Sequence, residues 1–269
     1  LPADPSGVAP PVDGFLTTRA WAEPLLRDAV ARARSVASDV EVAARLRPGT
    51  PARVLLDEGE DAQLLVVGSG GRCGLRGLLR RSVAVGVTAH ASCPVVVLRP
   101  PQVAFDAGWW PPRVVVGVDG SESCLPAVAF ALRAACRRGI PLVAVHAWTP
   151  DLPADLEAVC GPPEMAEASA RRTLDRVLAR LPLHPPARGP AGGGRGDPAH
   201  ALVDQSRGAA LLVVGARGRG RVLGTVLGSV SQAVLRDGRC PLAVIRHVGA
   251  PTARSAAEAD RDQSRGELL

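Results

Sequence analysis

Lysine and tyrosine are absent from this sequence of 269 residues, and aromatic side chains make up only 3% of it. Arginine is therefore the basic residue throughout, which we interpret as a coding bias rather than a functional choice. With so few aromatic side chains, the core must be built from valine, leucine, isoleucine and alanine. That composition favours α/β packing, in which alanine-rich helices cover valine-rich buried strands.

The sequence also lacks the patterns that would assign a membrane, a nucleic acid or a metal. It has no signal peptide and no apolar run of 18 or more residues, which argues against secretion and membrane spanning. The net charge is +6, but no block of five like charges occurs, so no nucleic-acid partner is expected. Its six cysteines form no CxxC pair and no zinc-type spacing with histidine. We therefore expect a cytoplasmic protein without a metal site.

The two halves of the chain align at a constant offset of 147 residues. The matched pairs are Gly68 with Gly215, Ser82 with Ser229, Cys93 with Cys240, Arg99 with Arg246, and Pro51-Ala52 with Pro198-Ala199. A fixed offset over nearly fifty residues indicates an internal duplication. We call the two copies the first repeat and the second repeat.

In the second repeat, strand-like and helix-like segments alternate, which predicts a doubly wound parallel sheet. The expected strands are Arg113–Val118, Pro141–Ala147, Ala210–Gly215 and Pro241–His247. The expected helices are Ser121–Arg138, Glu164–Leu181, Pro198–Ser206 and Ser229–Asp237. A further strand is expected within 183–194, short or absent because that stretch is rich in proline and glycine.

The first repeat has no counterpart of the first strand, first helix and second strand of the second repeat. At the offset, Ala147 would match position 0, since 147 − 147 = 0. The remaining segments predict helices at 19–37, 51–58 and 82–90, and strands at 40–46, 63–68 and 95–99. Such a unit is a partial domain that depends on the second repeat, with one edge of strand 63–68 unpaired. The alternative is that the sequence is a fragment or has a wrongly assigned start.

This organisation predicts four regions along the chain. They are a truncated first repeat at 1–100, a proline-rich linker at 101–112, a complete second repeat at 113–248, and a disordered tail at 249–269.

The second repeat contains a glycine pattern, G-x2-G-x9-G-S, between a buried strand and a helix. Its fixed positions are Gly215, Gly218, Gly228 and Ser229. Glycines permit positive φ and close backbone approach, and a helix N-terminus attracts anions. The pattern therefore predicts a loop that holds phosphate through bare amides and the Ser229 hydroxyl. The loop residues assigned to this site are Gly215, Ala216, Arg217, Gly218, Arg219, Gly220 and Arg221, with the arginines offsetting phosphate charge. The alternative is a solvated loop followed by an ordinary serine cap.

The first repeat carries a damaged copy of the same pattern. Gly68, Gly71 and Ser82 remain, but Arg81 stands where the second repeat has Gly228. A long side chain at that position should obstruct phosphate, so we predict no nucleotide site in the first repeat.

Several motifs in this order resemble the universal stress protein family. They are V-V-V-G-V-D-G-S at 114–121, V-H-A-W at 145–148, G-D-P-A at 196–199, the glycine pattern with L-V-V-G at 212–215, and C-P-L-A-V-I at 240–245. The resemblance implies a five-stranded parallel sheet of order 3-2-1-4-5. It also implies that ATP, as in a subset of the family, binds in the cleft between strands 1 and 4, which is where ligands bind such sheets.

The resemblance also assigns residues and contacts. Gly117 and Asp119 end the first strand at the mouth of the cleft, where Asp119 is implied to contact the adenosine portion. Asp119 as an ordinary turn or cap residue is the alternative. The Ala147 backbone is implied to line the adenine pocket, and we assign His146 to strand-end packing. Fifth strands pair antiparallel in family dimers, so 95–98 and 242–245 are candidates for such pairing within one chain or in a homodimer.

We therefore expect a stress-response protein that binds ATP, with Mg²⁺, in the second repeat and acts as a regulatory binding module. No catalytic constellation is present in the sequence, so an enzyme is not expected. One alternative is a nucleotide-free scaffold that acts by dimerisation through the fifth strand. A weaker alternative is an ATP-utilising enzyme of a related fold.

Overall fold

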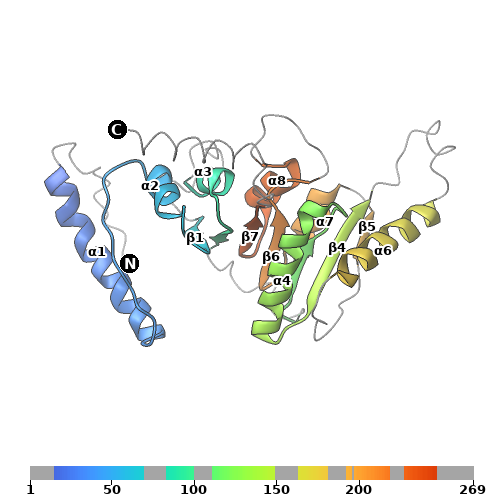
Figure 1. The fold of residues 1–269 in the computed structure, drawn as a ribbon, viewed down its shortest axis with the longest axis horizontal. Helices are drawn as coiled ribbons and strands as arrows, with labels where there is room; N and C mark the ends of the chain where they lie inside the picture. Colours follow the sequence, from blue (N-terminus) through green and yellow to red (C-terminus); the bar gives the residue numbers. More distant parts are fainter. Residues whose placement is uncertain are drawn as a thin grey trace, which may run out of the picture. The chain divides into compact units, whose positions relative to one another are not determined.

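The structure is a computed structural model, and Figure 1 traces its elements along the chain. The residues that it describes are 15–69, 83–99, 111–148, 163–180, 192–195, 197–218 and 227–246. Most of the expected linker at 101–112 and the whole expected tail at 249–269 lie outside these residues. The chain divides into two compact units, Leu1–Val54 and Leu55–Leu269, which we describe separately.

The first unit contains helix α1 (Phe15–Val36) and the start of α2 (Pro51–Glu58), both of which the sequence predicts. The strand predicted at 40–46 is wrong, because this segment is a loop whose Val40 and Leu46 side chains are 55% and 42% exposed. Its alternating apolar residues suit a strand. A strand forms only where a neighbour completes its hydrogen bonds, however, and none of the described strands pairs with this segment.

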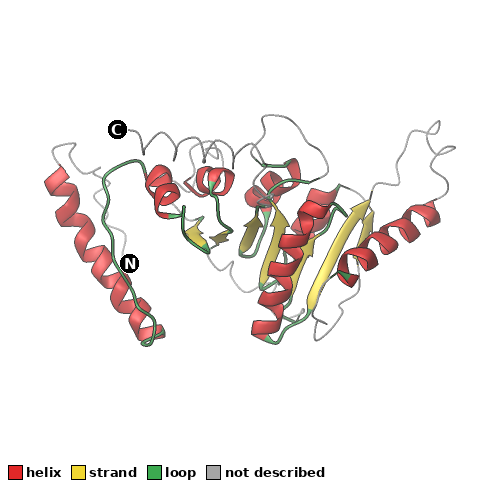
Figure 2. Cartoon of the chain, viewed as in Figure 1, coloured by secondary structure: helices red, strands yellow, loops and turns green. Residues whose placement is uncertain are grey.

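The second unit is built on a seven-stranded sheet, drawn as arrows in Figure 2. In sequence order, the strands are β1 (Leu65–Gly68), β2 (Val95–Leu98), β3 (Val114–Gly117), β4 (Leu142–Trp148), β5 (Gly192–Arg195), β6 (Leu211–Gly215) and β7 (Leu242–Ile245). Their spatial order in the described part of the chain is β1-β2-β7-β6-β3-β4-β5. The five strands of the second repeat are therefore arranged β5-β4-β3-β6-β7 and pair in parallel.

Helices cover both faces of the second repeat's sheet. Helix α4 (Leu125–Arg138), entered through the 3₁₀ turn η2 (Glu122–Cys124), packs on β3, β6 and β7. Helix α6 (Pro163–Ala179) packs on β4 and β5, and α7 (Pro198–Gln205) packs against α8 (Ser229–Asp237). Because side chains alternate along a strand, Val213 joins the core under α4, whereas Val214 faces α7.

The third strand of the second repeat is present but short. It is β5, whose residues Gly192–Arg195 pair in parallel with 145–148 of β4. Glycine favours strands poorly because it has no side chain to pack and loses much conformational freedom. The described part of this strand lies at the end of the predicted 183–194 stretch and continues to Arg195, and residues 181–191 lie outside the described part.

The two repeats join through an antiparallel pair of strands. Val95, Val96 and Val97 of β2 pair with Val244, Ala243 and Leu242 of β7. This confirms the predicted pairing of the fifth strands within one chain. Helix α3 (Val83–His90) packs on β2, and β1 forms the edge of the sheet with β2 as its neighbour. The first repeat thus adds two strands to a sheet that the second repeat largely builds.

Candidate functional site

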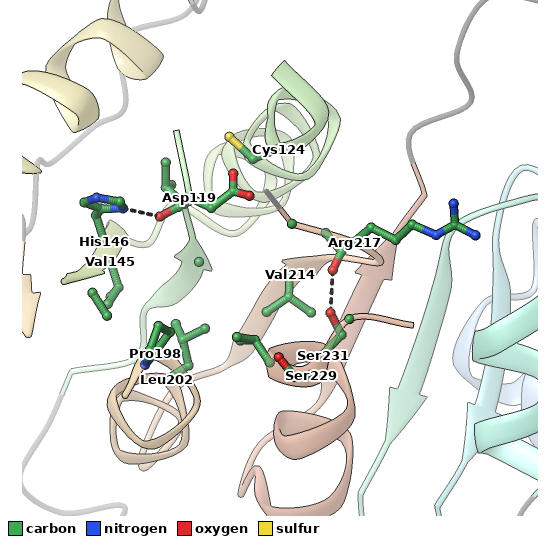
Figure 3. A pocket seen from close by; sticks show the side chains of 17 residues that line it. Asp119, Cys124, Val145, His146, Pro198, Leu202, Val214, Arg217, Ser229 and Ser231 are labelled. Carbon is green, nitrogen blue, oxygen red and sulfur yellow. Dashed lines mark hydrogen bonds between the residues drawn. The ribbon is translucent and has the colours of Figure 1, made fainter. Parts of the chain in front are cut away.

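A pocket of about 340 Å³ opens at the carboxyl ends of β3, β4 and β6. Helix α7 and the N-terminus of α8 complete its wall, as the labelled side chains of Figure 3 show. Strand order reverses between β3 and β6, because the chain passes from β3 to β4 on one side and from β6 to β7 on the other. Loops diverge at such a point and leave a crevice, so the position is typical of ligand sites in doubly wound sheets.

Most of the predicted site residues lie together around this pocket. Those that line it are Gly117, Asp119, Ala147, Gly215, Arg217, Gly218, Gly228 and Ser229. Ala216 is buried and is not part of the lining, although its carbonyl accepts a hydrogen bond from the Gly228 amide at 2.9 Å. Arg219, Gly220 and Arg221 lie outside the described residues.

Asp119 combines a turn contact with an open acceptor. Its Oδ1 accepts hydrogen bonds from the Ser121 amide at 2.9 Å and the Ser121 hydroxyl at 2.6 Å, which is the geometry of an Asx turn. Its Oδ2 is buried and has no hydrogen-bond partner. The turn interpretation is therefore correct for one oxygen only. The second oxygen is a buried acceptor that a ligand donor is able to satisfy.

The pocket glycines are needed for close approach rather than for unusual backbone angles. None of Gly215, Gly218 and Gly228 has a positive φ, so the expectation of positive φ is not met at these described positions. A Cβ at Gly218 would lie 3.0 Å from Asp119 Oδ2, and one at Gly215 would lie 3.1 Å from the Arg217 carbonyl oxygen. Likewise, a Cβ at Gly117 would lie 2.9 Å from Leu202 Cδ1. The turn after β6 therefore passes directly over the end of β3.

Helix α8 begins at the pocket with free amides. Its N-cap Gly228 has φ −68° and makes no side-chain cap, so the N–H groups of the first helical turn have no acceptor within the helix. Ser229 is exposed at the mouth of the pocket. Ser231, which the sequence did not reveal, donates its hydroxyl proton to the Gly215 carbonyl at 2.7 Å. This bond fixes the start of α8 against the end of β6.

The Arg217 side chain does not point into the centre of the pocket. It is exposed, and in Figure 3 it extends away from Asp119 and His146. Arg217 is the one described arginine of those predicted to offset phosphate charge, and it lies at the rim of the pocket. Burial lowers the pKa of Arg246 in the adjacent β7 segment, and the charge of Arg217 lowers it further.

Apolar side chains form another part of the pocket wall. Val118, Val145, Leu202 and Val214 line it, together with Cys124. Burial raises the pKa of the Cys124 thiol, and the neighbouring Asp119 carboxylate raises it further, so this thiol is neutral in the folded protein. The pocket therefore has an apolar side suited to a planar ring and an amide-rich side suited to an anion.

His146 and the α7 residues are site members that sequence reasoning missed. His146 lines the pocket, and its Nδ1 lies 2.6 Å from the Val118 carbonyl oxygen, so the ring N–H donates to the strand end beside Asp119. The assignment of His146 to packing alone is thus incomplete. Pro198 and Leu202 come from α7, and the G-D-P-A motif at 196–199 was the available signal for that helix. Asp197 caps it by accepting from the Ala199 amide at 3.1 Å.

The predicted loss of a site in the first repeat remains a prediction. Gly68 ends β1, but Gly71, Arg81 and Ser82 lie outside the described residues. Within the described part of the chain, no group of three or more His, Cys, Asp or Glu side chains is placed to hold a metal ion. No helix of that part is both long and apolar enough to cross a bilayer.

The sheet and the crevice at its switch point define a doubly wound α/β protein with two repeats. Comparison with known families identifies it further. The model described as "Universal stress protein family" matches residues 3–99 and again 112–246. The chain therefore belongs to the universal stress protein family and is a tandem member of it, which confirms the resemblance seen in the sequence.

Individual relatives agree with this assignment. A universal stress protein of Mycobacterium bovis is 36% identical over 250 residues, which cover 88% of this chain and 82% of that protein. A universal stress protein of Mycobacterium tuberculosis gives the same values. One from Mycolicibacterium smegmatis is 33% identical over 228 residues, covering 82% of this chain and 76% of that protein.

Solved structures share the fold. A universal stress protein from Archaeoglobus fulgidus aligns with a TM-score of 0.61 at 21% identity, over 90% of this chain and 82% of that chain. A putative universal stress protein from Pseudomonas aeruginosa aligns with a TM-score of 0.58 at 15% identity, over 83% of this chain and 78% of that one.

Proposed function

We propose that this universal stress protein binds ATP in the pocket of the second repeat and acts as a nucleotide-dependent regulatory module. The observation that supports the proposal is that hydrogen-bond donors and a hydrogen-bond acceptor, all without partners, line the same crevice. Asp119 Oδ2 is a buried acceptor without a partner, and the first turn of α8 supplies donors without acceptors. A nucleotide satisfies both sets, with hydroxyl groups at one end and phosphates at the other.

The two sides of the pocket fit the two ends of a nucleotide. Adenine is planar and apolar on its faces, so it suits the wall formed by Val118, Val145 and Leu202. The ribose hydroxyls are donors and suit Asp119, as the family resemblance implies. The phosphates suit the amides of the first turn of α8, from Ser229 to Ser231, because the α8 dipole places partial positive charge there.

Mg²⁺ would enter with ATP rather than occupy a protein site. Among the described residues that line the pocket, Asp119 is the one carboxylate, and its Oδ1 is engaged by Ser121. Mg²⁺ commonly keeps its waters and binds through substrate phosphates with few protein ligands. We assign no reaction to the site. Its proposed role is to alter the association of the protein when ATP is bound.

The test is calorimetric titration with Mg-ATP of the wild type, Gly228→Val and Gly68→Val. A Cβ at Gly228 would meet no protein atom nearer than 3.7 Å, so valine fits the chain but fills the space proposed for phosphate. We expect affinity to fall at least about tenfold, or ~1.4 kcal/mol. Gly68, the repeat counterpart of Gly215, has nothing within 4 Å of its Cβ position and is a control expected to bind like the wild type.

Equal heats for the wild type and Gly228→Val, or no heat for the wild type, would contradict the proposal. A second measurement separates it from the nucleotide-free scaffold. Protein purified without added nucleotide is denatured and filtered, and the filtrate is examined for adenine absorbance. Absence of nucleotide together with absence of titration heat would favour the scaffold. Multiple turnover of ATP would instead favour an enzyme.

A further inference from the structure

Arg99 connects the first repeat to the helix that begins at the pocket. It follows β2, and its Nη2 donates hydrogen bonds to the carbonyl oxygens of Val234 at 3.1 Å and Leu235 at 2.5 Å. These carbonyls lie in the last turn of α8. The Val234 carbonyl also accepts the amide of the C-cap residue Gly238 at 2.9 Å, and a guanidinium is a suitable further donor for carbonyls at a helix C-terminus.

An equivalent contact runs from the second repeat to the first. Arg246 is the counterpart of Arg99, since 246 − 99 = 147, and its Nη2 donates to the Ala89 carbonyl near the end of α3. Each fifth strand is therefore followed by an arginine that caps the last helix of the other repeat. Arg99 directly follows β2 and Arg246 directly follows β7, the two strands that pair antiparallel.

The contact that Arg99 makes is the one that reaches the described pocket, because α8 begins there. Helix α8 has nine residues and is therefore about 13 Å long, with Ser229 at the pocket and Leu235 near Arg99. Its start is held by Ser231 on the Gly215 carbonyl and by the Gly228 amide on the Ala216 carbonyl. Arg99 supplies the restraint at the opposite end.

We propose that Arg99 is a positioning residue for the nucleotide site: by capping α8 from the first repeat, it fixes the amides that receive phosphate in the second repeat. The inference rests on the proposed function for the ligand, but the restraint on α8 is a property of the protein alone. It assigns the first repeat a role as a support for the site of the second. Arg99 itself touches no ligand.

The test compares Arg99→Met with Arg236→Met. Methionine keeps an unbranched apolar stem but removes the donors and the charge. Arg236 is a matched control because it lies on α8 itself, is exposed and pairs with the adjacent Asp237. In the free protein, amide hydrogen exchange in α8 is expected to accelerate about tenfold in Arg99→Met and to stay within about twofold in Arg236→Met, because loss of the cap favours local opening.

The second measurement is the affinity of each variant for Mg-ATP and for adenosine. Arg99→Met is expected to weaken ATP binding about five- to tenfold and leave adenosine binding within about twofold, because the lost order affects the phosphate end. Arg99→Lys keeps the charge and a donor group but loses the planar fork of the guanidinium, so its ATP affinity should lie between those of Arg99→Met and the wild type. If Arg99→Met fails to fold, Arg99→Lys against Arg236→Lys is measured instead, with the same direction expected.

The outcomes separate the two proposals. Unchanged exchange in α8 of the Arg99 variants overturns the positioning role, whether or not ATP binds. Equal losses of ATP and adenosine affinity also overturn it, because they indicate a general loss of structure. A wild type that binds no ATP while Arg99→Met accelerates exchange in α8 contradicts the proposed function and leaves the restraint by Arg99 supported.

Discussion

The same sheet face is covered in one repeat and open in the other. Leu211, Val213 and Ile245 of the second repeat are 4%, 0% and 4% exposed in the core beneath α4. Their counterparts at the 147-residue offset are Leu64, Val66 and Leu98, which are 41%, 52% and 47% exposed. The side chains are nearly the same in the two repeats, so their burial is decided by whether a helix like α4 lies over them.

The opposite face of the two repeats is alike. Leu65, Val67, Val95 and Val97 are buried in the first repeat, as their counterparts Leu212, Val214, Leu242 and Val244 are in the second. Helix α3 packs on β2 just as α8 packs on β7. The apolar sequence of a strand therefore does not by itself determine whether the strand is buried. Each face of the sheet depends on the helices that cover it.

The largest effect should come from charge placed on the two faces. Val213→Asp buries a carboxylate under α4 and should lower the free energy of unfolding by more than about 4 kcal/mol, or prevent folding. Val66→Asp, at the matched position, should change it by less than about 1 kcal/mol because water reaches the site. Urea unfolding followed by circular dichroism gives both values. Comparable losses in the two variants would mean that Val66 is covered in solution.

A smaller effect should appear at high pH, because the closed interior of the second repeat opposes ionisation. Burial raises the pKa of the Cys240 thiol to about 11, so the folded state holds this proton more tightly than the unfolded chain does. The resulting stability is complete below pH ~9 and is lost as pH rises toward 11, for a total of about 2–3 kcal/mol. Urea unfolding between pH 8 and 11 measures this decline.

Cys240→Ala is the reference for that experiment, since it removes the titrating group. Its unfolding free energy should decline less between pH 9 and 11 than that of the wild type. The same slope in both proteins would show that Cys240 is not the group responsible.

The smallest effect should distinguish the glycines that end the equivalent strands. Gly215→Ala brings a Cβ within 3.1 Å of the Arg217 carbonyl oxygen, so the turn must shift, at a cost of about 1 kcal/mol. Gly68→Ala meets open space and should change stability by less than about 0.5 kcal/mol. Chemical unfolding measures the free energy of unfolding of both variants. A larger loss in Gly68→Ala than in Gly215→Ala would contradict this expectation.

Elements with local signals could be predicted from the sequence. Helices α2 and α8 occur at the predicted 51–58 and 229–237. Proline at the first position marks the start of α2, and the glycine-serine step marks that of α8. The valine runs of β3 and β6 were equally clear, because strands buried on both faces are continuously apolar.

Features that depend on distant partners could not be predicted. The pattern at 40–46 is strand-like, yet no described strand lies beside it, so local periodicity was misleading. Position 218 requires glycine because a Cβ there would lie 3.0 Å from Asp119 Oδ2. Asp119 is 99 positions earlier in the chain, since 218 − 119 = 99. Leu202 and Ser231 entered the site through helix packing and a bond to Gly215. No sequence motif at these two positions indicates that they belong to the site.

The β2–β7 junction also sets an order of events during synthesis. Val95 pairs with Val244, 149 residues later, since 244 − 95 = 149. A ribosome releases chain at about 5–20 residues per second, so β2 leaves roughly 7 to 30 seconds before its partner. Until β7 is made, β2 has only β1 as its neighbour in the described sheet, and two paired strands are marginal in water by themselves. Strand β2 therefore gains its second neighbour in the described sheet only after β7 has been made.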